Sequence, residues 1–404
     1  MSFQNLIHPR AVVAFLCAIA SLSVGLAARA PSQEDALVEK ENLFEVTTEG
    51  TDRSIRIPCL LALPDDSVLA FTSARSAVSD WANIRLLMRR SPDGGKTWEK
   101  AKVIVGGNQG VTDNPVAIWD AKKGLVHFLY QVDYERIYHL QSSDGGKTFS
   151  EAVEITPQLG AFQKMYPWRV IAPGPGHAIQ LRSGRLVVPV WLSPGKPNPS
   201  GKGKAHRPSV NSVITSDDYG RTWQCGDIVP ATLENPSEAV AVEASDGGVL
   251  LFIRNEDRAY RQAIAYSKDG ATGWSKPQLN EQLYNPICFS SALRLPGGAG
   301  KSRILFANPD SHAKPKPLMK WGGRARENLT LKLSYDEGKT WPVAKVLEPG
   351  RSSYSDLAVL SDGTILCLYE QGYIADNPYN NRYMTVARFN LEWLTDGTDS
   401  LKRE

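Results

Sequence analysis

The side chains with the clearest chemical potential are arginines, carboxylates and one tyrosine, scattered along the chain in separate short motifs. They are Arg56, Arg75, Asp80, Glu238, Arg254, Arg326, Tyr354 and Glu370. An arginine guanidinium donates two parallel, charge-assisted hydrogen bonds and therefore suits a carboxylate ligand. A carboxyl side chain can act as a general acid or base. The set favours proton-transfer chemistry on an anionic substrate.

Several common catalytic centres are excluded by the residues they require. The six histidines are isolated, and no His-Glu-x-x-His pattern for zinc is present. The chain has no Gly-x-Ser-x-Gly elbow and no Cys-x-x-Cys pair. Three Gly-Lys-Thr triplets resemble part of a phosphate loop, but the glycine needed five residues earlier is replaced by Arg90, Gln141 and Leu333. We therefore expect no nucleotide site, no metal and no cofactor.

The overall charge argues against a polyanionic partner. A net charge of +3 over 404 residues is too small to indicate binding to nucleic acid or to a membrane surface. We therefore expect no nucleic-acid partner, and any attraction for an anion must be local to one site. The hydrophobic content of 42% is ordinary for a globular protein.

The N-terminus has the pattern of a secretory signal. Residues 11–26 form an apolar run, and small residues follow it up to Ala30. This pattern predicts a signal peptide over residues 1–30, followed by a linker over 31–45. An uncleaved membrane anchor is the alternative, although the run is short for a bilayer. We expect an exported protein, periplasmic or secreted, without stable membrane insertion after removal of the signal.

The cysteines beyond the signal are Cys59, Cys225, Cys288 and Cys367, and no two are close in sequence. An oxidising compartment would permit disulfides. Four scattered cysteines are nevertheless more typical of buried, small apolar side chains. We predict no obligatory disulfide.

A repeated octapeptide, Ser-x-Asp-x-Gly-x-Thr-aromatic, is the strongest internal signal. Its four clean copies are Ser91–Trp98, Ser142–Phe149, Ser216–Trp223 and Ser334–Trp341, and a degenerate copy is Ser267–Trp274. Its Asp can bind nearby backbone N–H groups, its Gly can adopt a positive φ, and its aromatic can anchor the turn. Short strands with such a recurring turn motif are typical of a β-propeller with little helix.

The octapeptide resembles the Asp-box of the sialidase and BNR-repeat families, whose members fold as six-bladed propellers. The resemblance covers residues 46–396, with a C-terminal tail over 397–404. It implies an all-β, sialidase-like six-bladed β-propeller with peripheral, structural Asp-boxes. The final strand, 383–393, is expected to close the ring by pairing with the first blade. Residues 194–208, rich in Gly, Pro and Lys, are expected to form an exposed loop.

The resemblance also implies an activity, the removal of terminal α-linked sialic acids from glycoproteins, glycolipids or oligosaccharides. Sialic acid carries a carboxylate on its anomeric carbon, which an arginine fork can bind. A carboxylate nucleophile would be repelled by that group. A neutral tyrosine hydroxyl beside a carboxylate base avoids the repulsion and still gives retention through a covalent intermediate.

Three arginines match the family's carboxylate clamp. Arg56 lies in an Ile-Arg-Ile-Pro sequence that resembles the family's Arg-Ile-Pro signature. Arg254 follows the apolar run of the segment PSEAVAVEASDGGVLLFIR, and Arg326 precedes the strand that enters the last Asp-box. Arg324, two residues away, is the alternative to Arg326. The resemblance thus implies a clamp assembled from distant segments.

The remaining roles follow from the same resemblance. Tyr354 matches the nucleophile, and Glu370, sixteen residues later, would hold the first clamp arginine in place. Glu238 would take the proton from the nucleophile, with Glu243 as the rival assignment. Asp80 would protonate the leaving oxygen and then activate water.

One part of the pattern departs from the family. Arg75 matches a substrate-binding arginine, but the Glu-Gly that often precedes it is Ser73-Ala74 here. The subsite near the C4 hydroxyl is therefore expected to differ. Trp81, Trp119, Trp168 and Trp191 are candidates to line a pocket for the acyl or glycerol groups, and packing is the better interpretation for most of them.

Two alternatives remain open on this sequence. The first is a related propeller enzyme that acts on a deaminated sialic acid or transfers the sugar to an acceptor. The second is a non-catalytic glycan-binding propeller, which should tolerate loss of Tyr354 without a change in sugar affinity. The joint presence of Tyr354, Glu238 and Asp80 argues against the second.

Overall fold

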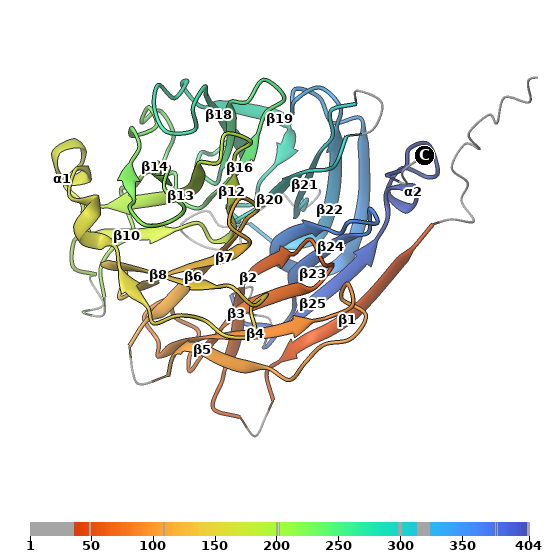
Figure 1. Ribbon diagram of the computed structural model, residues 1–404, viewed down its shortest axis with the longest axis horizontal. Coiled ribbons are helices and arrows are strands. Elements are labelled where there is room, and N and C mark those ends of the chain that lie inside the picture. Colours follow the sequence, from red (N-terminus) through yellow and green to blue (C-terminus); the bar gives the residue numbers. More distant parts are fainter. Residues whose placement is uncertain are drawn as a thin grey trace, which may run out of the picture.

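The strands of the chain form six sheets arranged around a common centre, as Figure 1 shows. The computed structural model describes residues 36–47, 50–107, 110–198, 201, 203–297, 301–312, 324–375, 377 and 379–401. The expected all-β, six-bladed propeller is confirmed. The expected signal peptide, 1–30, lies outside the described residues.

Each sheet is an antiparallel blade of four main strands. The first contains β2 (Ser54–Ala62), β3 (Val68–Arg75), β4 (Ile84–Ser91) and β5 (Lys102–Gly106). The second contains β6 (Thr112–Asp120), β7 (Leu125–Val132), β8 (Arg136–Ser142), β9 (Val153–Glu154) and the short β11 (Gly176–His177). The third contains β10 (Val170–Pro173), β12 (Ile179–Gln180), β13 (Leu186–Ser193), β14 (Val210–Ser216) and β15 (Gln224–Cys225).

The second half of the chain builds the other three blades. The fourth contains β16 (Ala239–Glu243), β17 (Val249–Ile253), β18 (Arg261–Ser267) and β19 (Gln278–Tyr284). The fifth contains β20 (Ser291–Arg294), β21 (Ile304–Pro309), β22 (Glu327–Ser334) and the first part of β23 (Val343–Val359). The sixth contains the rest of β23, β24 (Ile365–Tyr373), β25 (Asn381–Phe389) and β1 (Val38–Glu45).

The Asp-boxes are the turns from the third to the fourth strand of five blades. In the first, Gly95 N donates to Ser91 Oγ at 2.7 Å, and Gly95 has a φ of 78°. Asp93 accepts from Thr97 N at 2.9 Å and from Thr97 Oγ1 at 2.7 Å. These bonds lie within one octapeptide, so the turn forms from local chemistry alone. The sixth blade receives its outer strand from the N-terminus and has no such turn.

The ring closes differently from the sequence-based expectation. Residues 38–45, expected to be linker, form β1 and pair antiparallel with β25, for example Val38 with Phe389. β1 is thus the outer strand of the sixth blade, and the last strand does not pair with the sheet of β2 to β5. That strand also ends before residue 393. Residues 391–394 form the short helix α2 (Leu391–Leu394), capped by the Asn390 side chain.

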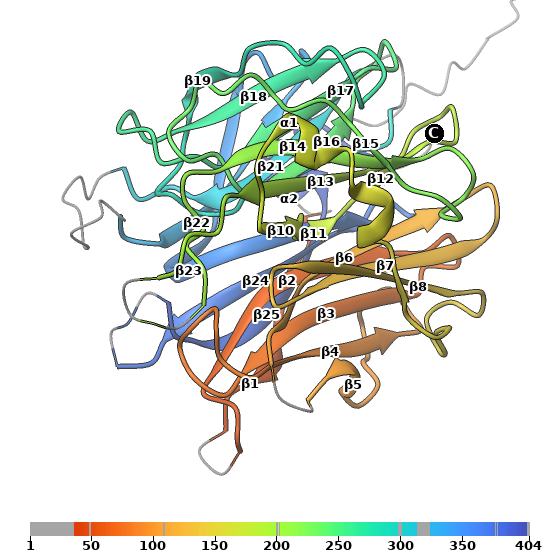
Figure 2. The same ribbon diagram turned by 90° about the vertical axis from the view of Figure 1, so that its left-hand side faces the viewer.

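The core lies between neighbouring blades rather than in one central layer. Phe71 on β3 stacks on Phe128 on β7 with ring centroids 4.5 Å apart, which joins the first and second blades. Trp223, the aromatic of the third Asp-box, belongs to the same buried hydrophobic cluster as Phe162 of helix α1 (Phe162–Met165). Figure 2 shows that α1 lies on the outside of the ring. The described cysteines carry free thiols, and Cys59, Cys288 and Cys367 are buried. No helix among the described residues is long and apolar enough to cross a bilayer.

A buried carboxylate ties four blades together. Asp356 on β23 accepts from Leu60 N at 2.8 Å, from His177 N at 2.8 Å and from Ser291 Oγ at 3.0 Å. His177 Nδ1 lies 2.7 Å from the same carboxylate. Since these partners belong to β2, β11 and β20, Asp356 fixes the blades relative to one another two residues from Tyr354.

A buried ion pair holds the C-terminal segment against the fifth blade. Arg303 Nε and Nη2 donate to Asp399 at 2.8 and 2.7 Å, and both residues are buried. Although burial alone would raise the pKa of Asp399, hydrogen bonds from Arg303 and Tyr335 hold that pKa below its ordinary value. A carboxyl with a lowered pKa stabilises the fold above its unfolded-state pKa, and that contribution is lost as the pH falls through the folded-state pKa.

We therefore expect Asp399→Asn to lower the free energy of unfolding by about 2 kcal/mol at pH 7. The difference from the wild type should shrink as the pH falls through the folded-state pKa of Asp399, which lies below the ordinary value, because the wild-type carboxyl also becomes protonated there. Urea unfolding at pH 7 and at the lowest pH at which the wild type stays folded measures it. An equal difference at the two pH values would rule out the charged pair as its cause.

Candidate active site

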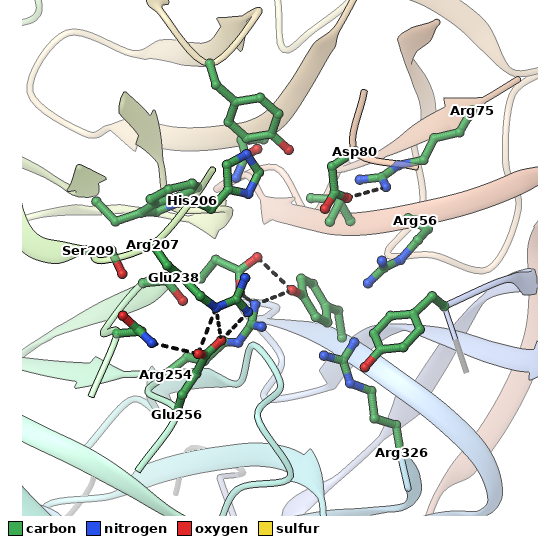
Figure 3. Close-up of a pocket in the computed structure, with 18 residues that line it drawn as sticks. Arg56, Arg75, Asp80, His206, Arg207, Ser209, Glu238, Arg254, Glu256 and Arg326 are labelled. Atoms are coloured by element: carbon green, nitrogen blue, oxygen red, sulfur yellow. Dashed lines mark hydrogen bonds and ion pairs between the residues drawn. The ribbon is translucent and has the colours of Figure 1, made fainter. Parts of the chain in front are cut away.

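Seven of the eight residues singled out in the sequence line one pocket of about 480 Å³. They are Arg56, Arg75, Asp80, Glu238, Arg254, Arg326 and Tyr354. The eighth, Glu370, is fully buried behind Arg56. The size falls in the usual range for a small-ligand site. Figure 3 shows the guanidinium groups of Arg56, Arg254 and Arg326 around one centre, with Asp80 and Arg75 together at its edge.

A tyrosine, a glutamate and an arginine meet at the centre of the pocket. Tyr354 Oη donates to Glu238 Oε1 at 2.7 Å. Arg254 Nη1 donates to the same hydroxyl oxygen at 2.8 Å and also pairs with Glu238 Oε2. The tyrosine lies on β23, whereas Glu238 immediately precedes β16 and Arg254 immediately follows β17. Adjacent strands of the fourth blade thus place Glu238 and Arg254 side by side.

This arrangement suits a nucleophile that is activated only during reaction. Burial raises the pKa of Tyr354 far above its usual range, and the charge of Arg254 offsets this only in part. The hydroxyl is therefore neutral at ordinary pH. Glu238 is placed to accept its proton, and Arg254 to stabilise the oxygen as negative charge develops there.

Glu370 supports both Arg56 and Tyr354. Its carboxylate accepts from Arg56 Nε at 3.2 Å and from Ile57 N at 2.9 Å. It also accepts from Tyr354 N at 3.3 Å and from Asn381 Nδ2 at 2.8 Å. The sequence motif predicted the contact with Arg56 but not the contact with the backbone of Tyr354. Glu370 therefore sets the relative position of an arginine and the tyrosine.

Arg326 is held from behind, which leaves its guanidinium facing the pocket. Its Nη1 donates to Ser353 Oγ at 3.2 Å and its Nη2 to Ile287 O at 2.6 Å. The guanidinium also lies 5.3 Å from the ring centroid of Tyr354, which is a cation–π distance. Because both of these hydrogen-bond partners are uncharged, the charge of Arg326 remains available to a ligand.

Each clamp arginine keeps a buried donor free. Among the described residues, Arg56 Nη2, Arg254 Nε and Arg326 Nε have no hydrogen-bond partner. A buried donor left unpaired costs roughly 1–3 kcal/mol. A carboxylate bound between the three arginines could satisfy such donors, so the unpaired groups favour an anionic ligand here.

A second arginine–carboxylate group lies at the edge of the pocket. Arg75 Nη1 donates to Asp80 Oδ1 at 2.7 Å, and its Nη2 donates to the fully buried Asp113 at 2.6 Å. The Asp80 side chain is 48% exposed. Although desolvation alone would raise the pKa of Asp80, the positive charge of Arg75 holds it below the ordinary value. Asp80 is thus ionised when no ligand is bound. Its carboxylate must take up a proton before it can act as a general acid.

The rival assignments do not reach the pocket. Glu243 accepts from Arg182 N at 3.2 Å and is absent from the pocket wall. Arg324 stacks on Tyr260, with its guanidinium carbon 4.0 Å from the ring centroid, and it is also absent from the wall. The structure thus favours Glu238 and Arg326.

Comparisons with known proteins show the family to which the chain belongs. The model of the BNR repeat-like domain matches residues 109–367, more than half of the chain. A sialidase of Micromonospora viridifaciens is 31% identical over 95% of this chain and 60% of its own length. Sialidase-3 of Mus musculus is 28% identical over 78% of this chain and 87% of its own length. The chain belongs to the sialidase family with BNR repeats.

Solved structures of other sialidase-family proteins share the fold. The Hadza microbial sialidase Hz136 is 23% identical, with a TM-score of 0.70 over 87% of this chain and 68% of its own. The intramolecular trans-sialidase of Ruminococcus gnavus, solved with oseltamivir carboxylate, is 18% identical, with a TM-score of 0.68 over 87% of this chain and 98% of its own. This chain therefore spans 60% of the Micromonospora relative but nearly all of the Ruminococcus structure.

In this sialidase-family pocket several wall residues had not been singled out in the sequence. They are Asn114, Tyr134, His206, Arg207, Asn235 and Glu256. His206 and Arg207 belong to residues 194–208, which were expected to form an exposed loop. Arg207 is exposed as expected, but its Nε donates to Glu256 Oε1 at 2.8 Å, and the half-buried ring of His206 packs on Tyr134. No local motif marks these residues, because their partners lie on other blades.

Of the four tryptophans of this sialidase-family chain that were candidates to line the pocket, one does so and the others pack elsewhere. Trp191 lines the pocket, and Trp81 packs beside it on Tyr134. Trp119 and Trp168 pack against hydrophobic clusters between blades. Among the described residues, no group of three or more His, Cys, Asp or Glu side chains is placed to hold a metal ion.

Proposed function

We propose that the chain is an exo-α-sialidase that hydrolyses terminal α-linked sialic acids with retention through a tyrosyl intermediate. One observation carries the proposal, the contact of Tyr354 Oη with both Glu238 and Arg254 inside a ring of three arginines. Membership of the sialidase family supports the substrate class. The partners would be sialylated glycoproteins, glycolipids and oligosaccharides.

The first half of the proposed reaction forms a covalent bond to Tyr354. The three clamp arginines bind the substrate carboxylate, which places the anomeric carbon beside the tyrosine hydroxyl. Tyr354 Oη attacks this carbon while its proton passes to Glu238. Asp80, which is ionised in the free protein, must first take up a proton from solvent. The bond to the glycosidic oxygen then breaks, and Asp80 protonates that oxygen as the aglycone leaves.

The second half releases sialic acid. Asp80, now ionised, takes a proton from water, and the water oxygen attacks the anomeric carbon. The bond to Tyr354 breaks, and Glu238 returns the proton to the tyrosine oxygen. Two inversions at one carbon give overall retention. A neutral nucleophile suits this substrate because a carboxylate would meet the charge of the substrate's own carboxylate.

We also propose that the protein acts outside the cytoplasm, either in a periplasm or after secretion. The apolar run over residues 11–26 and the alanines up to Ala30 support export. N-terminal sequencing of the protein recovered from outside the cytoplasm tests this, and we expect a processed N-terminus near residue 30. Recovery from the cytoplasm alone would contradict the proposal.

The stereochemical course of hydrolysis tests the activity. The protein is mixed with an aryl α-sialoside, and proton NMR follows which anomer of free sialic acid appears first. The α anomer should appear first, before mutarotation to the β form. An initial β anomer would contradict the tyrosyl mechanism. No release from this sialoside or from its deaminated counterpart would contradict the sialidase assignment, and a sugar product joined to an added acceptor would indicate transfer.

A further inference from the structure

The loop that carries Asp80 has little anchoring of its own. Residues 76–80 are exposed, and their backbone hydrogen bonds are local, such as Ser76 N to Asn83 O at 3.0 Å. The ion pair with Arg75 holds the carboxylate only while it is charged. Protonation of Asp80 removes the ionic part of that attraction and leaves at most a weaker hydrogen bond, at the moment when the acid must be in position. A second anchor that does not depend on charge would keep the loop in place.

Trp81, the next residue, packs against a cluster of aromatic rings in the wall of the pocket. Its ring centroid lies 5.2 Å from that of Tyr134 and 5.7 Å from that of His206. His206 in turn lies 4.5 Å from Tyr134 and 5.1 Å from Trp191, centroid to centroid. Figure 3 places His206 and Asp80 on the same side of the pocket, opposite Arg326. The indole thus joins the Asp80 loop to the second and third blades.

Gly203 covers the indole of Trp81. A Cβ added at Gly203 would lie 2.0 Å from Cδ2 and 2.1 Å from Cε2 of the indole, so only glycine lets the backbone pack against the ring. The backbone around Gly203 is itself fixed. Gly203 O accepts from Asn198 N at 3.2 Å, and Ala205 N donates to Lys196 O at 2.7 Å.

This short hairpin is tied to the propeller. Ser193 Oγ at the end of β13 donates to Ala205 O at 3.0 Å. Lys204 pairs with Glu135, and Arg207 pairs with Glu256. The surface that receives Trp81 is therefore held to three blades.

We propose that Trp81 and Gly203 are positioning residues for Asp80, with the indole held between the Gly203 backbone and the rings of Tyr134 and His206 so that the acid stays over the leaving oxygen. The proposal rests on the proposed sialidase function. It assigns a role in proton transfer to a segment that the sequence marked only as an exposed loop.

The dependence of rate on the leaving group separates this role from a purely structural one. A phenol leaves readily without protonation, whereas a sugar hydroxyl needs the acid. The value of kcat/KM covers steps up to cleavage of the glycosidic bond and therefore reports the acid step. Loss of Asp80 positioning should lower kcat/KM for sialyllactose much more than for 4-methylumbelliferyl α-sialoside.

The chain offers a matched pair of glycines for this test. Gly201 and Gly203 have φ values of +71° and +67°, but no atom lies within 4 Å of a Cβ added at Gly201. Gly203→Ala should lower kcat/KM about 10- to 100-fold on sialyllactose and less than about threefold on the aryl sialoside. Gly201→Ala, which carries the same backbone strain, should leave both values near those of the wild type.

Two results would overturn the proposal. One is an equal loss on the two substrates in Gly203→Ala, and the other is the same substrate-dependent loss in Gly201→Ala. If Gly203→Ala does not fold, as judged by its thermal unfolding, Trp81→Ala is measured instead and must give the same substrate-dependent loss. A wild-type protein inactive on both sialosides would count against the proposed function itself.

Discussion

Replacement of Tyr354 by phenylalanine is expected to lower kcat on an aryl α-sialoside by about a thousandfold or more. The variant removes the attacking oxygen, and no other described hydroxyl donates to Glu238. The phenylalanine ring can keep its contact with Phe289, whose centroid lies 5.6 Å away, and its place 5.0 Å from the Arg56 guanidinium. The fold should therefore survive while the reaction does not.

A tyrosine outside the pocket provides the control. Tyr130 is buried in the second blade and stacks on Tyr138 with centroids 5.4 Å apart. Tyr130→Phe should keep kcat within about twofold of the wild type, since this ring does not line the pocket. Steady-state kinetics and thermal unfolding of both variants make the comparison. Activity of Tyr354→Phe within tenfold of the wild type would exclude the tyrosine as nucleophile.

Arg254→Ala is expected to damage both catalysis and stability. Arg254 donates to Tyr354 and pairs with Glu238, whose exposed fraction is only 8%. Removing the arginine leaves a buried carboxylate unpaired, which costs about 3–5 kcal/mol of unfolding free energy. It also removes a donor to the developing charge and to the substrate carboxylate. We expect kcat/KM to fall at least about 10²- to 10³-fold.

Two further variants separate the effect on stability from the effect on catalysis. Arg254→Lys keeps the charge beside Glu238 but loses the planar fork, so it should regain stability more than activity. Arg185→Ala removes a more exposed pair with Asp217 and a hydrogen bond to Asp269 O, both outside the pocket. It should lower stability less than Arg254→Ala and leave kcat/KM near that of the wild type. Denaturant unfolding and kcat/KM measure both. If Arg254→Ala were as stable and as active as Arg185→Ala, the proposed role of Arg254 would be wrong.

The local parts of this fold could be predicted from sequence because their contacts are local. The bonds of an Asp-box lie within eight residues, as from Thr97 to Asp93, so the octapeptide contains the information that forms the turn. Closure of the ring could not be predicted in the same way. It joins Val38 to Phe389, and nothing near Val38 indicates that the edge of the last blade is its partner.

In the pocket, too, residues in short local motifs could be predicted and residues that depend on distant partners could not. Arg254 and Glu238 could be found because short motifs carry them, and the structure brings both to Tyr354. Asp113, which binds Arg75, and Gly203, which covers Trp81, could not be found in this way. Their significance comes from partners on other segments, and a glycine in a Gly-rich stretch looks like an ordinary loop residue.

The proposed mechanism requires a covalent bond between Tyr354 and the sugar. The reagent 2,3-difluorosialic acid tests for this bond. Fluorine at C3 slows an oxocarbenium-like step, and fluoride at C2 is a good leaving group, so the intermediate can accumulate. The measurement is peptide mass spectrometry of the wild type and Tyr354→Phe after treatment with this reagent. We expect one fluorosialyl adduct on the peptide that contains Tyr354, and none in the variant. An adduct on Glu238, or one that persists in Tyr354→Phe, would exclude Tyr354 as the nucleophile.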